Sequence, residues 1–202
     1  MSFDLWLTYV GAMLLISLSP GSGCMNTLST ALAVGFRRSW SAIAGLQVGL
    51  IIQLGVVGIG LSALLATTPW AFSLLQWIGV AYLAWIGLEK LRMRPTGFAS
   101  ASIGEGRDQF VRALLLNSTN PKSFVFLGVF FPRFVMIDQP LLPQYGVLAV
   151  TSVVIDTAVM FGYAAMAARV RIFLQSPERL HRTQQVFGLL FLTAALGLAL
   201  SH

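Results

Sequence analysis

The chain has 202 residues, of which 56% are hydrophobic and only 10% are charged, and its mean hydropathy is +0.79. A soluble domain carries about 25% charged residues, so this composition excludes a soluble globular domain and a disordered chain, and a single cysteine excludes a disulfide scaffold or a zinc domain. The net charge of +6 does not indicate a nucleic-acid partner, because the basic residues lie in short clusters between apolar runs. We expect an integral membrane protein that resides in a lipid bilayer.

Long charge-free stretches predict six membrane-spanning helices, because a helix needs roughly 20 apolar residues to cross the hydrocarbon core. The N-terminal apolar run has no Lys or Arg before Arg37, so we interpret it as a retained span and not as a signal peptide. Thr67-Thr68-Pro69 is the expected turn between the second and third spans. The predicted spans are residues 5–33, 40–66, 70–91, 113–134, 142–168 and 184–201.

The basic residues predict the orientation of these spans. Of 13 Lys and Arg residues, eleven fall in the first, third and fifth connections, among them Lys90. The positive-inside rule places those connections in the cytoplasm and both termini in the periplasm. The polar segment at about residues 92–112 is a cytoplasmic linker between two halves, residues 5–91 and 113–201. Because each half has three spans, the fold class is an all-α integral membrane protein of two inverted three-helix repeats, forming a single transporter domain over residues 1–202.

Two prolines interrupt spans at matching places in the two halves. Pro20 lies midway along the first span and Pro121 midway along the fourth, 101 residues apart. Proline removes a backbone donor and clashes with the preceding turn. Paired interrupted helices in inverted halves are a sequence pointer to a transporter's binding site. The alternative is that each proline only kinks its helix for packing.

Lys122 and Asp156 are the two charged side chains deep within the predicted spans. A charge at that depth costs a few kcal/mol or more unless it is paired or hydrated, so each is a candidate functional residue. One hypothesis is that Lys122 holds a substrate carboxylate while Asp156 holds an amine or carries the coupling proton. The alternative is a buried salt bridge that joins the fourth and fifth spans.

Further polar side chains at depth complete the predicted site. Gln53 is expected to hydrogen-bond a neighbouring helix, and the glycines of Gly45-Leu46-Gln47-Val48-Gly49 are expected to allow close helix packing. Asp156 is the candidate for proton coupling. The candidate substrate-binding residues are Ser19, Pro20, Gly21, Asn26, Gln47, Asn117, Asn120, Pro121 and Lys122.

The sequence predicts that the protein is not an enzyme. His181 lies in a connection and His202 ends the chain, so no span offers a histidine for haem or for a Ser–His protease. No P-loop is present, and the four aspartates are too scattered for a metal-dependent phosphotransferase. We expect neither a cofactor nor a metal ion.

These motifs resemble the lysine exporter (LysE/RhtB) superfamily over nearly the whole chain. The resemblance rests on Leu18-Ser19-Pro20-Gly21-Ser22-Gly23, the 45–49 glycine motif, GVAYLAWIG at 79–87, Asn120-Pro121-Lys122 with Phe131-Pro132, and the Asp156 span. It is closest to the homoserine/threonine resistance branch, which includes homoserine and homoserine-lactone efflux proteins. Arg133 departs from that pattern, because many relatives carry glutamine there.

The resemblance implies secondary-active export of homoserine, threonine, homoserine lactone or similar neutral amino acids. It also implies proton antiport across the bacterial inner membrane, and we expect a homodimer. Two alternatives remain: a gated passive efflux channel, and an exporter of another amino acid or of a cation. One deep charge of each sign favours a zwitterionic substrate.

Overall fold

The computed structural model describes residues 2–67, 69–92, 106–136, 139–167, 169–170 and 176–200. Every regular element in these ranges is helical, as the sequence predicts. The short 3-10 turns are η1 (Phe36–Arg38) and η2 (Phe131–Phe134). The α-helices are α1 (Phe3–Leu18), α2 (Ser22–Val34), α3 (Trp40–Thr67), α4 (Pro69–Arg92), α5 (Gly106–Ser118), α6 (Pro121–Phe130), α7 (Leu141–Ala165) and α9 (Pro177–Leu200).

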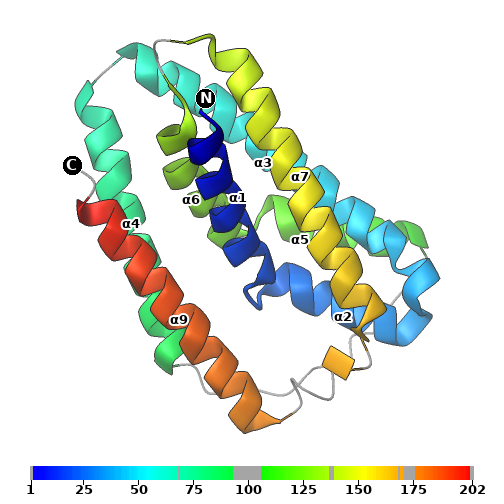
Figure 1. Ribbon diagram of the computed structural model, residues 1–202. Coiled ribbons are helices and arrows are strands. Elements are labelled where there is room, and N and C mark those ends of the chain that lie inside the picture. Colours follow the sequence, from blue (N-terminus) through cyan, green and yellow to red (C-terminus); the bar gives the residue numbers. More distant parts are fainter. Residues whose placement is uncertain are drawn as a thin grey trace.

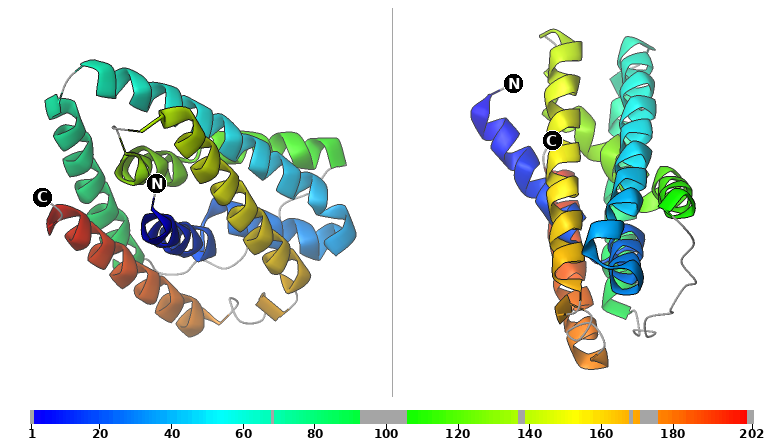
Figure 2. Two further views of the ribbon diagram at one scale, coloured as in Figure 1. Left: turned by 45° about the horizontal axis from the view of Figure 1, so that its top comes forward. Right: turned by 90° about the vertical axis from the view of Figure 1, so that its right-hand side faces the viewer.

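The long helices lie on either side of α1 and α6, and the short helix α5 projects at the edge of the molecule (Figures 1 and 2). α4 packs along α9 on one side and α3 lies toward α7 on the other, with α1 and α6 between these pairs. Inward side chains such as Tyr9, Phe131 and Phe191 form the apolar core. Large apolar residues also face outward: Ile59 is 76% exposed and Leu142 is 82% exposed. Apolar surface of this kind suits contact with lipid rather than water.

Two of the predicted spans are broken where the prolines predict. α1 ends at Leu18 and α2 begins at Ser22 with a bend of 56°, and we call residues 19–21 the first break. α5 ends at Ser118 and α6 begins at Pro121, and we call residues 119–120 the second break. α5 lies across the long axis that α3 and α7 follow (Figure 2). The prolines therefore separate helices that point in different directions.

Some predicted boundaries are wrong. The predicted linker extends to residue 112, but α5 already begins at Gly106, so its charged first turns are helical. The last helix begins at Pro177 instead of residue 184. In both places charged residues interrupt the apolar pattern without interrupting the helix. The rest of the linker, residues 93–105, lies outside the described residues.

The predicted place of Lys90 in a connection is also wrong, because it lies within α4. It lies two residues before the end of α4 and is only 7% exposed. The other predicted boundaries agree with the structure to within three residues at α3, α4 and α7. α3 ends and α4 begins on either side of the turn predicted at residues 67–69.

Among the described residues, three helices are long and apolar enough to cross a membrane. They are Phe36–Gly60, Leu141–Ala165 and His181–Leu200. The bent pair α1 and α2 makes a fourth if it is one span. The structure therefore describes an all-helical protein with three or four apolar spans, and the six-span count stays a prediction.

Glycines set the closest helix contacts. A Cβ at Gly49 would lie 2.9 Å from both the Cβ of Asn117 and the carbonyl oxygen of Leu114, so α3 and α5 approach backbone to backbone. The same close approach joins α4 to α9, where a Cβ at Gly87 would lie 2.9 Å from the carbonyl oxygen of Gly188. The packing role predicted for the 45–49 glycines is confirmed.

We expect Gly49→Ala to destabilise the protein. The added methyl group has no space against α5, and overpacking of this kind costs about 1–3 kcal/mol. The midpoint of thermal denaturation in detergent should fall. Gly55→Ala is the matched control on the same helix, because nothing lies within 4 Å of its Cβ position. Equal midpoints for the two variants would show that the α3–α5 contact is not close.

Candidate functional site

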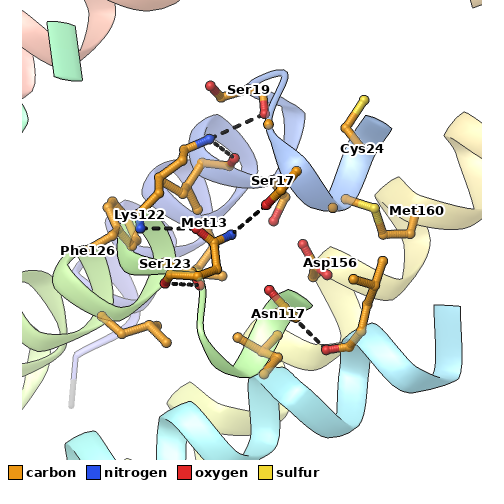
Figure 3. A pocket seen from close by; sticks show the side chains of 18 residues that line it. Met13, Ser17, Ser19, Cys24, Asn117, Lys122, Ser123, Phe126, Asp156 and Met160 are labelled. Carbon is orange, nitrogen blue, oxygen red and sulfur yellow. Dashed lines mark hydrogen bonds between the residues drawn. The ribbon is translucent and has the colours of Figure 1, made fainter. Parts of the chain in front are cut away.

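A polar pocket lies against the first break (Figure 3). Its volume is about 60 Å³, room for only a few water molecules. Residues from six helices line it, so the two halves of the sequence meet there. Its polar lining residues are Ser17, Ser19, Ser22, Asn117, Asn120, Lys122, Ser123 and Asp156. We call it the central pocket.

Side chains from other helices bind the backbone carbonyls at the end of α1. The last carbonyls of a helix have no amide partner within it. The Nζ atom of Lys122 donates to the carbonyls of Ile16 at 3.5 Å and Ser19 at 3.3 Å, and the hydroxyl of Tyr163 donates to the carbonyl of Leu18 at 2.8 Å. The broken end of α1 is therefore held by α6 and α7.

Lys90 holds the same break from α4. Its Nζ atom donates to the carbonyl of Pro20 at 3.0 Å and to the Oε1 atom of Gln184 at 2.9 Å. Sequence reasoning missed this residue, because a lysine close to the end of a span resembles a loop base. Its position three residues after Gly87, on the face that packs against α9, is the signal that could have found it.

The two breaks differ at the helix that follows each. Asn120 caps α6, and its Oδ1 atom accepts from the amide of Lys122 at 3.1 Å. The residue before α2 is Gly21, which offers no side-chain cap to the first amides of that helix. These amides carry the positive end of the helix dipole and lie at the central pocket. The Nζ atom of Lys122 lies 3.4 Å from the Cβ position of Gly21, so it adds a positive charge at the same place.

Asp156 lies across the pocket from Lys122 (Figure 3). Its Oδ2 atom accepts from the Nε2 atom of Gln47 at 2.8 Å, and the side chain of Ser17 lies beside it. In the part of the chain that the structure describes, Lys122 bonds to carbonyls and no ion pair joins it to Asp156. The two opposite charges therefore face one pocket without forming the salt bridge considered as an alternative.

Gln53 holds the second break together. Its side chain is fully buried, and its Nε2 atom donates to the carbonyls of Asn117 at 2.9 Å and Asn120 at 3.2 Å. Its Oε1 atom accepts from the hydroxyl of Ser123 at 2.7 Å. The helix-to-helix role predicted for Gln53 is confirmed, and the second break is satisfied by a neutral side chain.

Six of the predicted site residues line the central pocket: Ser19, Gly21, Asn117, Asn120, Lys122 and Asp156. The other four are placed differently. Pro20 and Pro121 line a neighbouring pocket. Gln47 reaches the site through its bond to Asp156, and Asn26 is buried on α2 with an unpartnered Nδ2 atom and does not line the central pocket. Within the described ranges no three His, Cys, Asp or Glu side chains are grouped to hold a metal ion.

Comparison with known proteins finds relatives along the whole chain. Residues 14–202 match the family model described as LysE type translocator. The chain is 41% identical over 201 residues to a homoserine/homoserine lactone efflux protein of Salmonella typhimurium, covering 98% of both chains. It is 42% identical over 201 residues to an uncharacterized membrane protein of Vibrio cholerae, again over 98% of both. A leucine efflux protein of Enterobacter is 28% identical over 204 residues, 98% of this chain and 96% of that protein. No solved structure matches.

We expect Gln53→Leu to destabilise the second break. The leucine removes the side-chain hydrogen bonds to the carbonyls of Asn117 and Asn120, which keep their backbone donors, and the bond from the hydroxyl of Ser123, and each lost bond costs about 0.5–1.5 kcal/mol. The midpoint of thermal denaturation in detergent should fall by several degrees relative to wild type. Ser118→Ala is the control, because that hydroxyl is exposed and bonds only within its own helix. A Gln53→Leu protein as stable as the control would show that Gln53 does not hold the break.

Proposed function

The chain belongs to the LysE type translocator family, and on that basis we propose that it exports homoserine, threonine, homoserine lactone or similar small neutral amino acids across the bacterial inner membrane. The family and its relatives' names identify a membrane amino-acid transporter and not an enzyme. One observation carries the choice of substrate. Lys122 and Asp156 line the same pocket with opposite charges and are not paired with each other. Together they suit a zwitterion.

The geometry favours one orientation of such a substrate. Its carboxylate would lie between Lys122 and the uncapped first amides of α2, since a helix N-terminus binds anions. Its ammonium would lie toward Asp156. The hydroxyl of Ser19, which is 3% exposed and has no partner, is available to a polar side chain such as that of homoserine.

The pocket must widen to admit an amino acid, because its volume of about 60 Å³ holds only a few water molecules. We infer that the structure represents a contracted state of a carrier that opens by movement at the breaks. α1 and α2 bend by 56° around the first break, which gives the movement a hinge. This property favours a carrier over a passive channel, which needs a continuous opening.

The proposed topology has six crossings in two inverted halves. Each half supplies a broken pair followed by two long helices: α1, α2, α3 and α4, then α5, α6, α7 and α9. The two chain ends lie at the same end of the molecule as the α3–α4 turn (Figure 1), which an even number of crossings requires. With the basic connections in the cytoplasm, both termini are periplasmic.

Proton antiport is the proposed source of energy, with Asp156 as the coupling residue. A carboxylate that binds either a proton or the substrate ammonium, but not both at once, exchanges one for the other. The driving force suffices, because moving one charge across the membrane is worth about 2.3 kcal/mol per 100 mV. Gln47 would orient the carboxylate through its bond of 2.8 Å.

We expect Asp156→Asn to abolish the response of transport to a proton gradient, because an amide neither takes up a proton nor pairs with an ammonium. The measurement is efflux of radiolabelled homoserine from preloaded proteoliposomes, with and without an imposed pH gradient. Asp108→Asn is the control, an exposed carboxylate in the first turn of α5. Gradient-stimulated efflux that persists in Asp156→Asn would exclude Asp156 from coupling, and wild-type efflux indifferent to the gradient would favour a channel.

We expect Lys122→Met to lower homoserine efflux by about tenfold to a hundredfold, since a hydrogen bond to a charged group contributes about 1.5–3 kcal/mol. The same proteoliposome assay measures it. Arg112→Met, which removes an exposed charge from α5, should behave as wild type. Size-exclusion chromatography in detergent checks that Lys122→Met is folded, because Lys122 also binds carbonyls of α1. Unchanged efflux in a folded variant would remove Lys122 from the binding site.

A further inference from the structure

Lys90 is a buried cation, and its hydrogen-bond partners within the described residues are neutral. It is 7% exposed and donates to a carbonyl and to an amide oxygen, those of Pro20 and Gln184. Among the described residues, no carboxylate forms an ion pair with it. A buried charge without an opposite charge is costly. A neutral donor would suffice to satisfy the carbonyl of Pro20, so the position of an ammonium there favours an anionic group nearby.

A second pocket, which we call the side pocket, adjoins Lys90. Its volume is about 420 Å³, and it lies between α4, α9 and the first break. Lys90 and Gln184 form its buried wall, while the exposed Glu89 and Trp85 and the half-buried Tyr82 complete it on α4. The pocket therefore offers a cation, a carboxylate and two aromatic rings within one space larger than the central pocket.

The side pocket and the central pocket share three lining residues, Gly21, Ser22 and Lys122. The first break and the Lys122 side chain therefore border both spaces. Lys90 binds the carbonyl of Pro20 from one side, and Lys122 binds that of Ser19 from the other. Pro20 and Ser19 are adjacent in the chain. A carboxylate that leaves Lys90 would therefore reach Lys122 after it passes this part of the first break.

We propose that the side pocket is a second binding site for the transported amino acid, in which Lys90 binds the carboxylate and Glu89, with Tyr82 and Trp85, binds the ammonium. The proposal rests on the proposed function and extends it. Substrate occupies this site before it crosses the first break to Lys122. The site lies toward the end of α4, at the opposite end of the molecule from both termini (Figure 1), which the proposed topology makes the cytoplasmic side.

The test compares homoserine, which has a carboxylate, with homoserine lactone, which has none but keeps the ammonium. Transport into inside-out membrane vesicles is measured for wild type, Lys90→Met and Glu89→Gln. We expect Lys90→Met to raise the KM for homoserine about tenfold or more, a change of ~1.4 kcal/mol, and to leave the KM for the lactone within about twofold. Glu89→Gln should raise both. Arg92→Met, an exposed charge two residues further along α4, is the matched control and should raise neither.

Equal effects of Lys90→Met on both compounds, or a fall in maximal rate with KM unchanged, would overturn the proposal and leave Lys90 a helix-capping residue. A labelling experiment keeps the test independent of transport. In a Cys24→Ala, Glu89→Gln background, the thiol of Lys90→Cys should react about tenfold faster with an anionic than with a cationic methanethiosulfonate reagent, because Lys122 and the start of α2 attract anions. Arg92→Cys gives the reference ratio. Equal ratios would overturn the site, whereas wild-type vesicles that transport neither compound would overturn the proposed function alone.

Discussion

In the described part of the chain, the carbonyl groups of Leu18, Ser19 and Pro20 receive no backbone amide across the first break, because α1 ends at Leu18 and the chain turns at Pro20. In a membrane such groups cost several kcal/mol each unless protein satisfies them. Lys122, Tyr163 and Lys90 do so from α6, α7 and α4. This one requirement brings four helices to a common point and places two cations beside the first break. The central pocket and the side pocket are the spaces left on either side of it.

At the second break, neutral side chains bind the backbone carbonyls. Gln53 bonds to its carbonyls and Asn120 caps the helix that follows, so neutral side chains serve both sides of this break. Each half of the chain therefore contains an interrupted helix, but the two breaks differ in the groups that bind them. The second break is followed directly by α6, which carries Lys122. The first break, with its uncapped α2 and its two lysines, is where an anionic group gains most.

The sequence was sufficient to predict the helical fold and the position of both breaks, because proline acts on its own backbone whatever surrounds it. It also predicted the glycine contacts and the role of Gln53, since a small or amide side chain inside a span has few other uses. It did not predict that Lys90 is buried or that α5 begins at Gly106. Both depend on which way a charged side chain points at a helix end, and a long side chain there can reach water or protein equally well. For Lys90, the packing of α4 against α9 and the first break determines that the side chain points into the protein.

The lysines that would bind substrate already bind the backbone, and this links binding to conformation. A carboxylate that takes the hydrogen bonds of Lys90 or Lys122 must displace the carbonyl of Pro20 or Ser19. The end of α1 then loses its attachment to α4 or α6. A ligand shifts a conformational equilibrium only by as much as it binds the two states differently. The two states differ in their affinity for substrate. In the contracted state both lysines donate hydrogen bonds to backbone carbonyls, whereas in a substrate-bound state they would donate to the substrate. Occupation of the proposed sites would thus release the hinge at the first break.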